Sequence, residues 1–316
     1  MTGATPPGAL APIDGLLVVD KPAGVTSHDV VDRVRRVAGT KKVGHAGTLD
    51  PMATGVLVLG VGRATRLLGH LVLTGKCYDA TIRLGQTTTT DDVDGATTSS
   101  TDASAVPDDA IARGAGALTG HLEQVPSSVS AVKVDGRRAY QRVRAGEQVV
   151  LPARSVEVTR LDVLAIRRPG EVVDVDVVIA CSSGTYVRAL ARDLGAALGV
   201  GGHLTALRRT AVGPYGIELA RTLEELAADF RVIGLGDAAA AAFPSRRVGA
   251  EDAQAIAHGR PLPLTGNGSS GPVAVLDQDG ALLALVRDDE ERQQARPLVV
   301  FAPGAGGPAP TGSAGG

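Results

Sequence analysis

The segment KKVGHAGTLDPMATGVLVLGVG, residues 41–62, joins a Gly- and Thr-rich turn to an almost uninterrupted apolar run. Asp50 lies between the two, directly before Pro51. A residue before proline is disfavoured in helical conformation, so we expect Asp50 in extended backbone at the edge of a buried strand. Gly44 and Gly47 would let a large ligand approach the backbone closely. Ordinary turn chemistry also explains an Asp-Pro pair, so this segment alone leaves both interpretations open.

Size and composition indicate a soluble globular protein with room for one large domain and a smaller one. The chain has 316 residues, 44% hydrophobic and 21% charged. No apolar run approaches the roughly 18 residues that a membrane span needs. The first ten residues lack a basic region and an apolar region, so we expect no signal peptide. Cys77 and Cys181 lie far apart in the sequence, which favours reduced cysteines in a cytoplasm over a disulfide or metal pair.

The net charge of −2 does not indicate a nucleic-acid partner, but the charge is unevenly distributed. Residues 32–42, DRVRRVAGTKK, include five basic residues and one acidic residue. Residues 133–144, KVDGRRAYQRVR, also include five basic residues and one acidic residue. A solvated helix face would explain either run alone. Two such runs in one chain favour a polyanion as the partner.

Strand and helix patterns alternate along the chain without a regular βα rhythm, which predicts an α+β fold. We expect strands within 15–20, 76–85 and 171–181, and a helix over 185–199. Another helix should follow the first strand, capped by Thr26 or Ser27, with one apolar face made by Val30, Val31, Val34 and Val37. The polar stretch 86–107 has no hydrophobic period and is typical of a mobile functional loop or a linker.

The composition predicts two domains with unstructured ends. Residues 1–12 and 303–316 are rich in Pro, Gly and Ala, and we expect them to be disordered. A large domain should span 13–234, with insertions near 86–106 and 126–150. Residues 235–247 are predicted to be a linker, and 248–302 a small β-rich module with a hairpin that turns at Asp279-Gly280.

No familiar cofactor motif is present. The six histidines form no HExxH or Cys/His cluster, and GHLVLTGKC at 69–77 has the wrong spacing for a phosphate loop. Neither GxSxG nor a GxGxxG that opens a helix occurs. We therefore predict no metal, no nucleotide and no other cofactor.

Arg188 is a candidate site residue because of its place in the helix predicted over 185–199. If Thr185 caps that helix, Arg188 lies in the first turn, where the interaction of a cation with the helix dipole is unfavourable by about 0.3–1 kcal/mol. A nearby anion would offset this unfavourable energy. An arginine side chain that extends into water would avoid it as well. Aromatic residues make up 2% of the chain, and Tyr78 and Tyr186 fall beside the segments already described. Each ring could belong to the core or stack on a displaced base.

Five motifs in order resemble the TruB family of tRNA pseudouridine synthases over roughly residues 14–215. They are GLLVVDKPAGVTSHDVV, VGHAGTLDPMATGVL, KCYDATIRLGQTTTTDDVDG, PSSVSAVKVDGRRAYQRVRAG and CSSGTYVRALARDLG. The likeness implies a pseudouridine synthase fold, with a mixed, mostly antiparallel sheet, flanking helices and a central cleft. Beyond the linker the chain is similar to the family's C-terminal PUA-type RNA-binding domain, and this likeness is weaker.

The resemblance also implies roles for particular residues. Asp50 matches the catalytic aspartate, Arg188 the arginine that pairs with it, and Tyr186 the neighbouring tyrosine near the base and sugar. On the substrate side, Tyr78 would stack on the flipped uracil, and His45 would fill the space that the flipped nucleotide leaves. Leu207 would form an apolar wall of the pocket, and Lys21 would support the active-site loop. Lys133 lies in an RNA-contacting insertion.

The function implied is the conversion of uridine 55 in the T-loop of tRNA to pseudouridine, without a cofactor. The implied partner is the T-arm of tRNA, and we expect a cytoplasmic monomer with no membrane association. The alternative is a tRNA-binding or tRNA-folding protein whose catalysis is secondary or lost. A glycosidase would need a second catalytic carboxylate, which no motif supplies.

Overall fold

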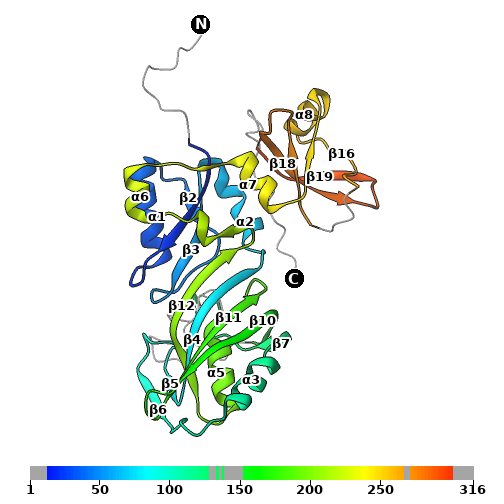
Figure 1. Cartoon of the computed structure of the whole chain (residues 1–316). Coiled ribbons are helices and arrows are strands. Elements are labelled where there is room, and N and C mark those ends of the chain that lie inside the picture. The colour runs from blue at the N-terminus through cyan, green and yellow to red at the C-terminus, as the bar shows by residue number, and fades with distance from the viewer. Residues whose placement is uncertain (1–12, 128–132, 135–136, 139–151, 267–270, 302–316) are drawn as a thin grey trace.

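The computed structural model describes residues 13–127, 133–134, 137–138, 152–266 and 271–301. The ends predicted to be disordered, 1–12 and 303–316, and most of the insertion predicted near 126–150 lie outside these residues. Figure 1 shows a large sheet through the body of the molecule and a smaller C-terminal sheet set to one side. The prediction of an α+β fold with a mixed, mostly antiparallel sheet is confirmed.

Ten strands of the described residues form the large sheet. They are β1 (Gly15–Lys21), β2 (Val43–His45), β3 (Thr54–Val61), β4 (Lys76–Leu84), β7 (Gly120–Gln124), β10 (Arg154–Arg167), β11 (Val173–Cys181), β12 (Gly202–Val212), β13 (Tyr215–Gly216) and β14 (Ile233–Gly234). The main path runs β14-β1-β3-β12-β4-β11-β10-β7, with β2 beside β3 and β13 beside β12. Every pairing is antiparallel except that of β3 with β12.

The parallel contact between β3 and β12 is a narrow junction in the middle of the sheet. It consists of two residue pairs, Arg208 with Thr54 and Arg209 with Gly55. Gly55 has φ +95°, and a Cβ there would lie 2.2 Å from the carbonyl oxygen of Arg209, so only glycine fits. The loop that contains Asp50 ends at this junction, which brings it beside β12 and its neighbour β4.

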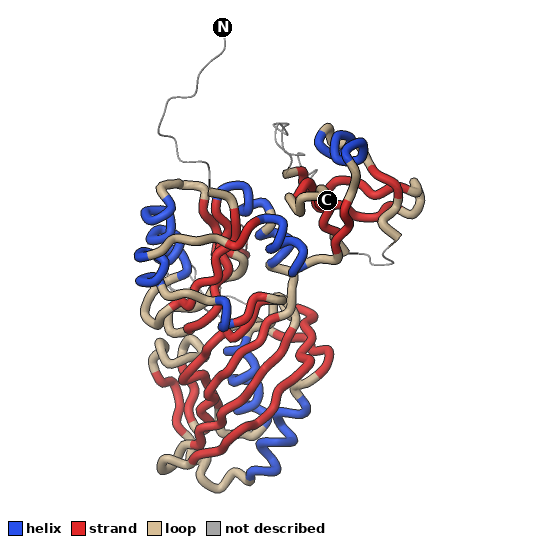
Figure 2. Tube along the Cα trace, turned by 45° about the horizontal axis from the view of Figure 1, so that its top comes forward, coloured by secondary structure: helices blue, strands red, loops and turns tan. Residues whose placement is uncertain are grey.

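Helices cover both faces of the large sheet around β1 and β3, and one face of the half that contains β4 and β11, whose other face is open (Figure 2). They are α1 (Ser27–Ala38), α2 (Leu68–Leu71), α3 (Asp108–Ala117), α5 (Val187–Ala197), α6 (Leu223–Ala228) and α7 (Leu235–Ala242), with 3₁₀ turns η1 (Gly62–Arg66) and η2 (Ile217–Leu219). Of the two residues predicted to cap α1, Thr26 is the N-cap residue, and it forms a capping box with Asp29. Val37 was predicted on the apolar face but is 40% exposed, because it borders an open groove between α1 and α6 in the last turn.

Two local predictions in the large domain were wrong. Thr185 does not cap α5: its hydroxyl donates to the Ser182 carbonyl, and Tyr186 is the N-cap residue. The polar stretch 86–107 contains a two-stranded sheet of β5 (Gln86–Thr88) and β6 (Thr97–Ser100). Its turn is attached to β12, since the Leu204 amide donates to the Asp91 carbonyl at 3.1 Å. Backbone hydrogen bonds therefore order this segment, although it has no apolar face.

The small sheet contains β15 (Ser245–Arg247), β16 (Leu262–Pro263), β17 (Val273–Leu276), β18 (Leu282–Asp289) and β19 (Gln294–Val300), in the order β15-β17-β18-β19-β16. Helix α8 (Ala250–Ala257) packs against it. The hairpin predicted at Asp279-Gly280 is present, with Gly280 at φ +86°. A further hairpin in the described residues pairs β8 (Lys133–Val134) with β9 (Arg137–Arg138).

The linker predicted over 235–247 is not an unstructured connection. It forms α7, whose Ala238 and Ala239 are fully buried, and β15, which joins the small sheet. An alanine run favours helix, and here the small side chains also allow close packing. One apolar core joins residues of the large sheet, such as Leu16, to residues of the small sheet, such as Leu285. The two parts therefore pack directly on each other.

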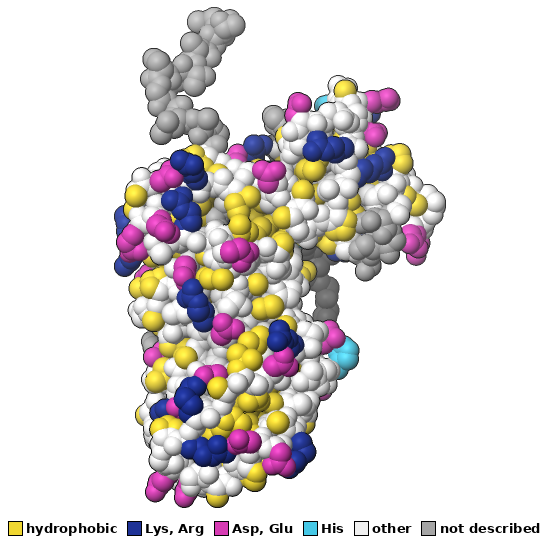
Figure 3. Space-filling view, in the orientation of Figure 1, with side chains coloured by type: hydrophobic (Ala, Val, Ile, Leu, Met, Phe, Trp, Pro, Cys, Tyr) yellow, Lys and Arg dark blue, Asp and Glu magenta, His cyan; other side chains and the backbone are white. Residues whose placement is uncertain are grey.

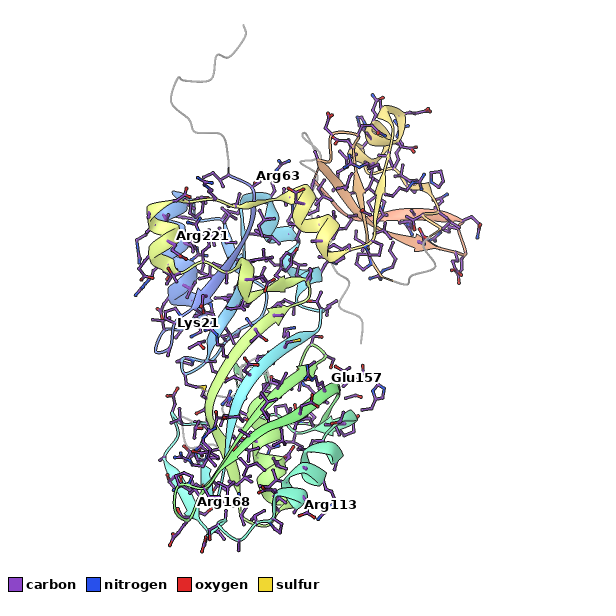
Figure 4. All side chains as sticks on the ribbon, viewed as in Figure 1. Lys21, Arg63, Arg113, Glu157, Arg168 and Arg221 are labelled. Atoms are coloured by element: carbon purple, nitrogen blue, oxygen red, sulfur yellow. The ribbon has the colours of Figure 1, made fainter. Side chains whose placement is uncertain are left out.

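Arginine side chains reinforce this contact. Arg63, which lies on the side facing the small sheet (Figure 4), donates to the Phe301 carbonyl at 2.7 Å and is paired with Asp14 at 2.6 Å. Arg66 donates to the Val300 carbonyl at 2.8 Å, and its guanidinium lies 4.7 Å from the centre of the Phe301 ring. None of the described helices is both long and apolar enough to cross a membrane.

Candidate active site

A pocket of about 260 Å³ opens at the junction between β3 and β12. Five parts of the chain line it: the loop before β3, the end of α2, strand β4, strand β12 and the start of α5. The structure brings five of the residues singled out from the sequence to this pocket, namely Asp50, Tyr78, Tyr186, Arg188 and Leu207. These residues come from four separate segments, so the tertiary structure assembles the site.

An ion pair joins Asp50 to Arg188 in this pocket. Nε of Arg188 lies 3.0 Å from Oδ2 of Asp50, and the two side chains are 7% and 36% exposed. Arg188 is the second residue of α5, where the helix dipole disfavours a cation. The anion that this position called for is therefore present. The more exposed carboxylate faces the pocket, and the buried guanidinium supports it from behind.

Asp92 is a second acid on the same guanidinium, and the sequence analysis missed it. Its carboxylate lies 3.3 Å from Nη1 of Arg188 and is 5% exposed. The same Nη1 donates to the Thr90 carbonyl at 2.8 Å. The Asp94 amide donates to Asp92 at 3.1 Å, which fixes the turn. The only signal in the sequence is an acidic group in the polar stretch after a strand, and no local pattern distinguishes Asp92 from the acids beside it.

The pKa of Asp50 is raised above its ordinary value of 3.8. Removal from water is the main cause, and the charge of Arg188 opposes it. Asp92 raises the pKa as well, and Lys21 lowers it. The charges of Arg188 and Lys21 therefore favour the ionised form of the carboxylate, against the effect of burial.

Three side chains hold the loop that carries Asp50. The hydroxyl of Ser27 accepts from the Leu49 amide at 2.9 Å and donates to the Leu49 carbonyl at 3.1 Å. Arg209, 1% exposed, donates to the carbonyls of Gly47, Thr48 and Val56 at 3.2, 3.3 and 2.7 Å. Ser27 and Arg209 were not identified from the sequence, because each acts on backbone far away in the chain.

Lys21 is the third support, and its predicted place among the substrate-binding residues needs correction. The side chain is fully buried at the end of β1 (Figure 4), so it has no surface to offer to RNA. Its ammonium donates to the carbonyls of Pro22, Val25 and Pro51 at 3.0, 2.8 and 3.3 Å. Burial lowers the pKa of Lys21 to about 8, although the charge of Asp50 works against this shift. Lys21 therefore acts on the loop, as the resemblance implied.

We expect Lys21→Met to lower the thermal stability of the protein. Methionine leaves three carbonyls without a donor, and each buried unsatisfied group costs about 1–3 kcal/mol. Differential scanning fluorimetry would measure the melting temperature. Lys41→Met is the matched control, because Lys41 is exposed. Equal melting temperatures for the two variants would show that Lys21 does not hold the loop.

Tyr78 and Leu207 form the apolar part of the pocket. Alternation along β4 places Lys76 and Tyr78 on the same face, and Tyr78 is 6% exposed. Burial raises the pKa of the Tyr78 phenol, so the ring is neutral. Leu207, on β12, is 8% exposed. The ammonium of Lys76 donates to the carbonyls of Val72 and Thr74 at 3.0 and 2.9 Å. A flat apolar group can therefore enter beside the carboxylate.

His45, which was predicted to bind substrate, does not line this pocket. It ends β2 before the loop that carries Asp50, with its ring edge-on to that of His28 at a centroid distance of 5.6 Å. Burial lowers the pKa of His45, which favours a neutral ring. The side chain of Lys133 lies outside the described part of the structure, as does most of the basic run 133–144.

The described surface carries charges of both signs. On the face seen in Figure 3, basic and acidic side chains are interspersed rather than gathered in one patch. In the run 32–42 the side chains of Arg33, Arg36 and Lys41 are exposed. The described residues contain no group of three or more His, Cys, Asp or Glu side chains arranged to hold a metal ion.

Solved structures with the same architecture identify the class of protein. The chain matches a structure titled "Crystal Structure of a Cbf5-Nop10-Gar1 Complex" with a TM-score of 0.70 and 27% identity, covering 91% of this chain and 84% of that one. It also matches "Structure of H/ACA RNP bound to a substrate RNA containing 2'-deoxyuridine" with a TM-score of 0.68 and 26% identity, over 92% and 85% of the two chains. The fold is that of a pseudouridine synthase.

Sequence comparison identifies the family within this class. Residues 35–187 match the TruB family pseudouridylate synthase N-terminal domain, 188–234 the tRNA pseudouridylate synthase B C-terminal domain, and 243–302 the tRNA pseudouridine synthase II C-terminal domain. The tRNA pseudouridine synthase B of Thermobifida fusca is 59% identical over 92% of this chain and 99% of its own. That of Arthrobacter sp. is 56% identical over 92% and 97%. The chain belongs to the TruB family, and it is an isomerase that acts on uridine in tRNA.

Proposed function

We propose that this enzyme converts uridine 55 in the T-loop of tRNA to pseudouridine, with Asp50 as the catalytic carboxylate. The observation that carries the proposal is the ion pair between Asp50 and Arg188 at 3.0 Å in a pocket lined by Tyr78. An ionisable acid, its cation and a flat apolar wall are what the isomerisation of a nucleobase needs.

The reaction breaks the bond between N1 and C1′, turns the uracil and forms a bond between C5 and C1′. The proton on C5 is lost and N1 gains one, so there is no net oxidation or reduction. We therefore propose a reaction without a cofactor. We favour attack by Asp50 at C1′ of the ribose, while attack at C6 of the uracil and deprotonation at C2′ are the other routes. Arg188 stabilises the ionised carboxylate and aims it.

The uracil has to leave the stacked loop before it can enter the pocket. Extrusion costs a few kcal/mol of stacking, and a ring that receives the base offsets part of it. We propose that Tyr78 stacks on the flipped uracil and that Leu207 packs beside it. Tyr186, at the start of α5, would assist proton movement near the base and sugar. His45, at the end of β2, would fill the space that the nucleotide vacates.

The remaining surface would grip the phosphate backbone without reading its sequence. The exposed basic residues of the run 32–42, Lys133 with its insertion and the small C-terminal sheet support this role. We propose a catalytic domain over 13–234 and a PUA-like RNA-binding domain whose first strand is β15. We also propose a monomer in the cytoplasm, where reduced cysteines such as Cys77 and Cys181 are the rule.

Release of tritium from C5-labelled uridine tests the proposal, because pseudouridine formation removes the hydrogen on C5. We expect release from a T-arm hairpin and none from an anticodon-arm hairpin of the same tRNA. Equal release from both hairpins would contradict the assignment of the T-arm. Tight binding of the T-arm without any release would favour the alternative of a tRNA-binding protein that has lost catalysis.

A further inference from the structure

Gln124, at the end of β7, makes two hydrogen bonds to the backbone of Tyr186. The Tyr186 amide donates to Oε1 of Gln124 at 2.8 Å, and Nε2 of Gln124 donates to the Tyr186 carbonyl at 3.1 Å. The side chain of Gln124 is 3% exposed. A primary amide offers a donor and an acceptor at once, so glutamine can satisfy both backbone groups of one residue. No sequence motif assigned a role to this residue.

This contact lies where α5 begins, two residues before Arg188. Tyr186 is the N-cap residue of α5, and its own side chain makes no capping hydrogen bond. One turn further along, Arg192 donates to the Val125 carbonyl at 2.9 Å. The end of β7 is thus tied to α5 on both sides of Arg188. The sheet edge therefore helps to fix where the first turn of α5 lies.

We propose that Gln124 is a positioning residue that fixes Tyr186, and through it Arg188, against the carboxylate of Asp50. The inference rests on the proposed function, because it gives Gln124 a role only if the pair of Asp50 and Arg188 is catalytic. Gln124 itself is buried and is not one of the residues that line the pocket. Its loss should therefore act on the chemical step and leave the binding of RNA largely intact.

The main test is Gln124→Met, which keeps the length of the side chain but makes neither hydrogen bond. Since a misplacement of about 1 Å in a reacting group can cost 10²-fold, we expect the single-turnover rate constant to fall about 10- to 100-fold. The Kd for a T-arm hairpin should stay within about threefold, because phosphate contacts dominate affinity. The side chain in Gln124→Asn is too short to make both hydrogen bonds, so the single-turnover rate constant should fall in this variant too. If the methionine variant does not fold, Gln124→Asn tests the positioning role in its place.

The pH profile separates positioning from a merely structural role. The carboxylate of Asp50 senses Arg188, Asp92, Lys21 and Asp94, and of these Arg188 has the largest effect on its pKa. A displaced Arg188 should move the acid limb of the rate profile to higher pH. A loss of stability alone would lower the melting temperature without moving that limb. Gln278→Met is the matched control for the position of the acid limb, because Gln278, between β17 and β18, donates to the Val248 carbonyl at 3.0 Å and neither residue lines the pocket.

A wild-type rate and an unmoved acid limb in both Gln124 variants would overturn the inference. So would a loss of rate that follows entirely from weaker RNA binding. The proposed function is tested separately by Asp50→Asn. If Asp50→Asn is inactive while both Gln124 variants behave as wild type, the positioning role alone fails. If Asp50→Asn retains turnover, the assignment of the catalytic acid fails first.

Discussion

Replacing Asp50 by asparagine is expected to reduce pseudouridine formation by at least about 10⁴-fold, the scale of losing a catalytic nucleophile. Asparagine has the same shape, but its amide is neither a nucleophile nor a base. The loop should keep its position, because Ser27, Arg209 and Lys21 hold the backbone and not the carboxylate. Tritium release from C5-labelled uridine in a T-arm hairpin measures the loss, and filter binding should give a Kd within a few fold of wild type.

Asp79→Asn is the matched control for this change. Asp79 is the residue after Tyr78 on β4, and alternation places it on the opposite, exposed face. The same chemical change there should leave the rate within about twofold, as is usual for an exposed position. If Asp50→Asn retains turnover, Asp50 is not the catalytic carboxylate, whatever the control shows.

Replacing Arg188 by methionine is expected to have the second largest effect. The variant leaves Asp50 and Asp92 without their shared cation, and the loss of one partner of a buried ion pair costs about 3–5 kcal/mol. We expect a loss of about 10²- to 10³-fold in the single-turnover rate constant at neutral pH, comparable to removal of one electrostatic contact in an active site. The melting temperature should fall as well.

The pH dependence gives the sharper test of Arg188. Asp50 must be ionised to act, so the rate falls as the pH drops through the pKa of Asp50. That pKa is already raised by burial, and the charge of Arg188 is the largest influence that lowers it. Without Arg188 the pKa rises further, and the acid limb of the rate profile moves to higher pH. Arg188→Lys, which restores a charge, should move the limb part of the way back.

Arg83→Met is a control for the loss of an ion pair as such. Arg83 on β4 contacts Asp174 at 2.7 Å, away from the pocket. Its removal should lower the melting temperature while the acid limb stays in place. An acid limb that does not move in Arg188→Met would show that Arg188 does not govern the ionisation of Asp50.

The local features of the chain were the ones that its sequence predicted well. Alternating apolar residues in 76–85 and 171–181 predicted β4 and β11, and Asp279-Gly280 predicted the hairpin between β17 and β18. The position of Arg188 in the first turn of a helix called for an anion, which the structure supplies. The strands, the hairpin and the position of Arg188 in its helix follow from residues that are neighbours in the chain, whereas the anion itself, Asp50, comes from a distant segment.

Errors arose where tertiary packing outweighed composition. The alanine-rich segment 235–247 has the composition of a linker, yet burial of Ala238 and Ala239 makes it a packed helix. The polar segment 86–107 has no apolar face, yet its turn is held by β12 and by Arg188. In both cases the partner that stabilises the segment lies elsewhere in the chain.

The sequence by itself determined the family, the strands that flank the site and the acid that faces the pocket, because these are recorded in motifs and short-range periodicity. Only the tertiary structure decided which groups surround that acid. Asp92, Arg209, Ser27 and Gln124 reach the site through the order and register of strands distant in the sequence. A buried polar contact is specified by where two backbones meet in space, and no local pattern of residues encodes that meeting.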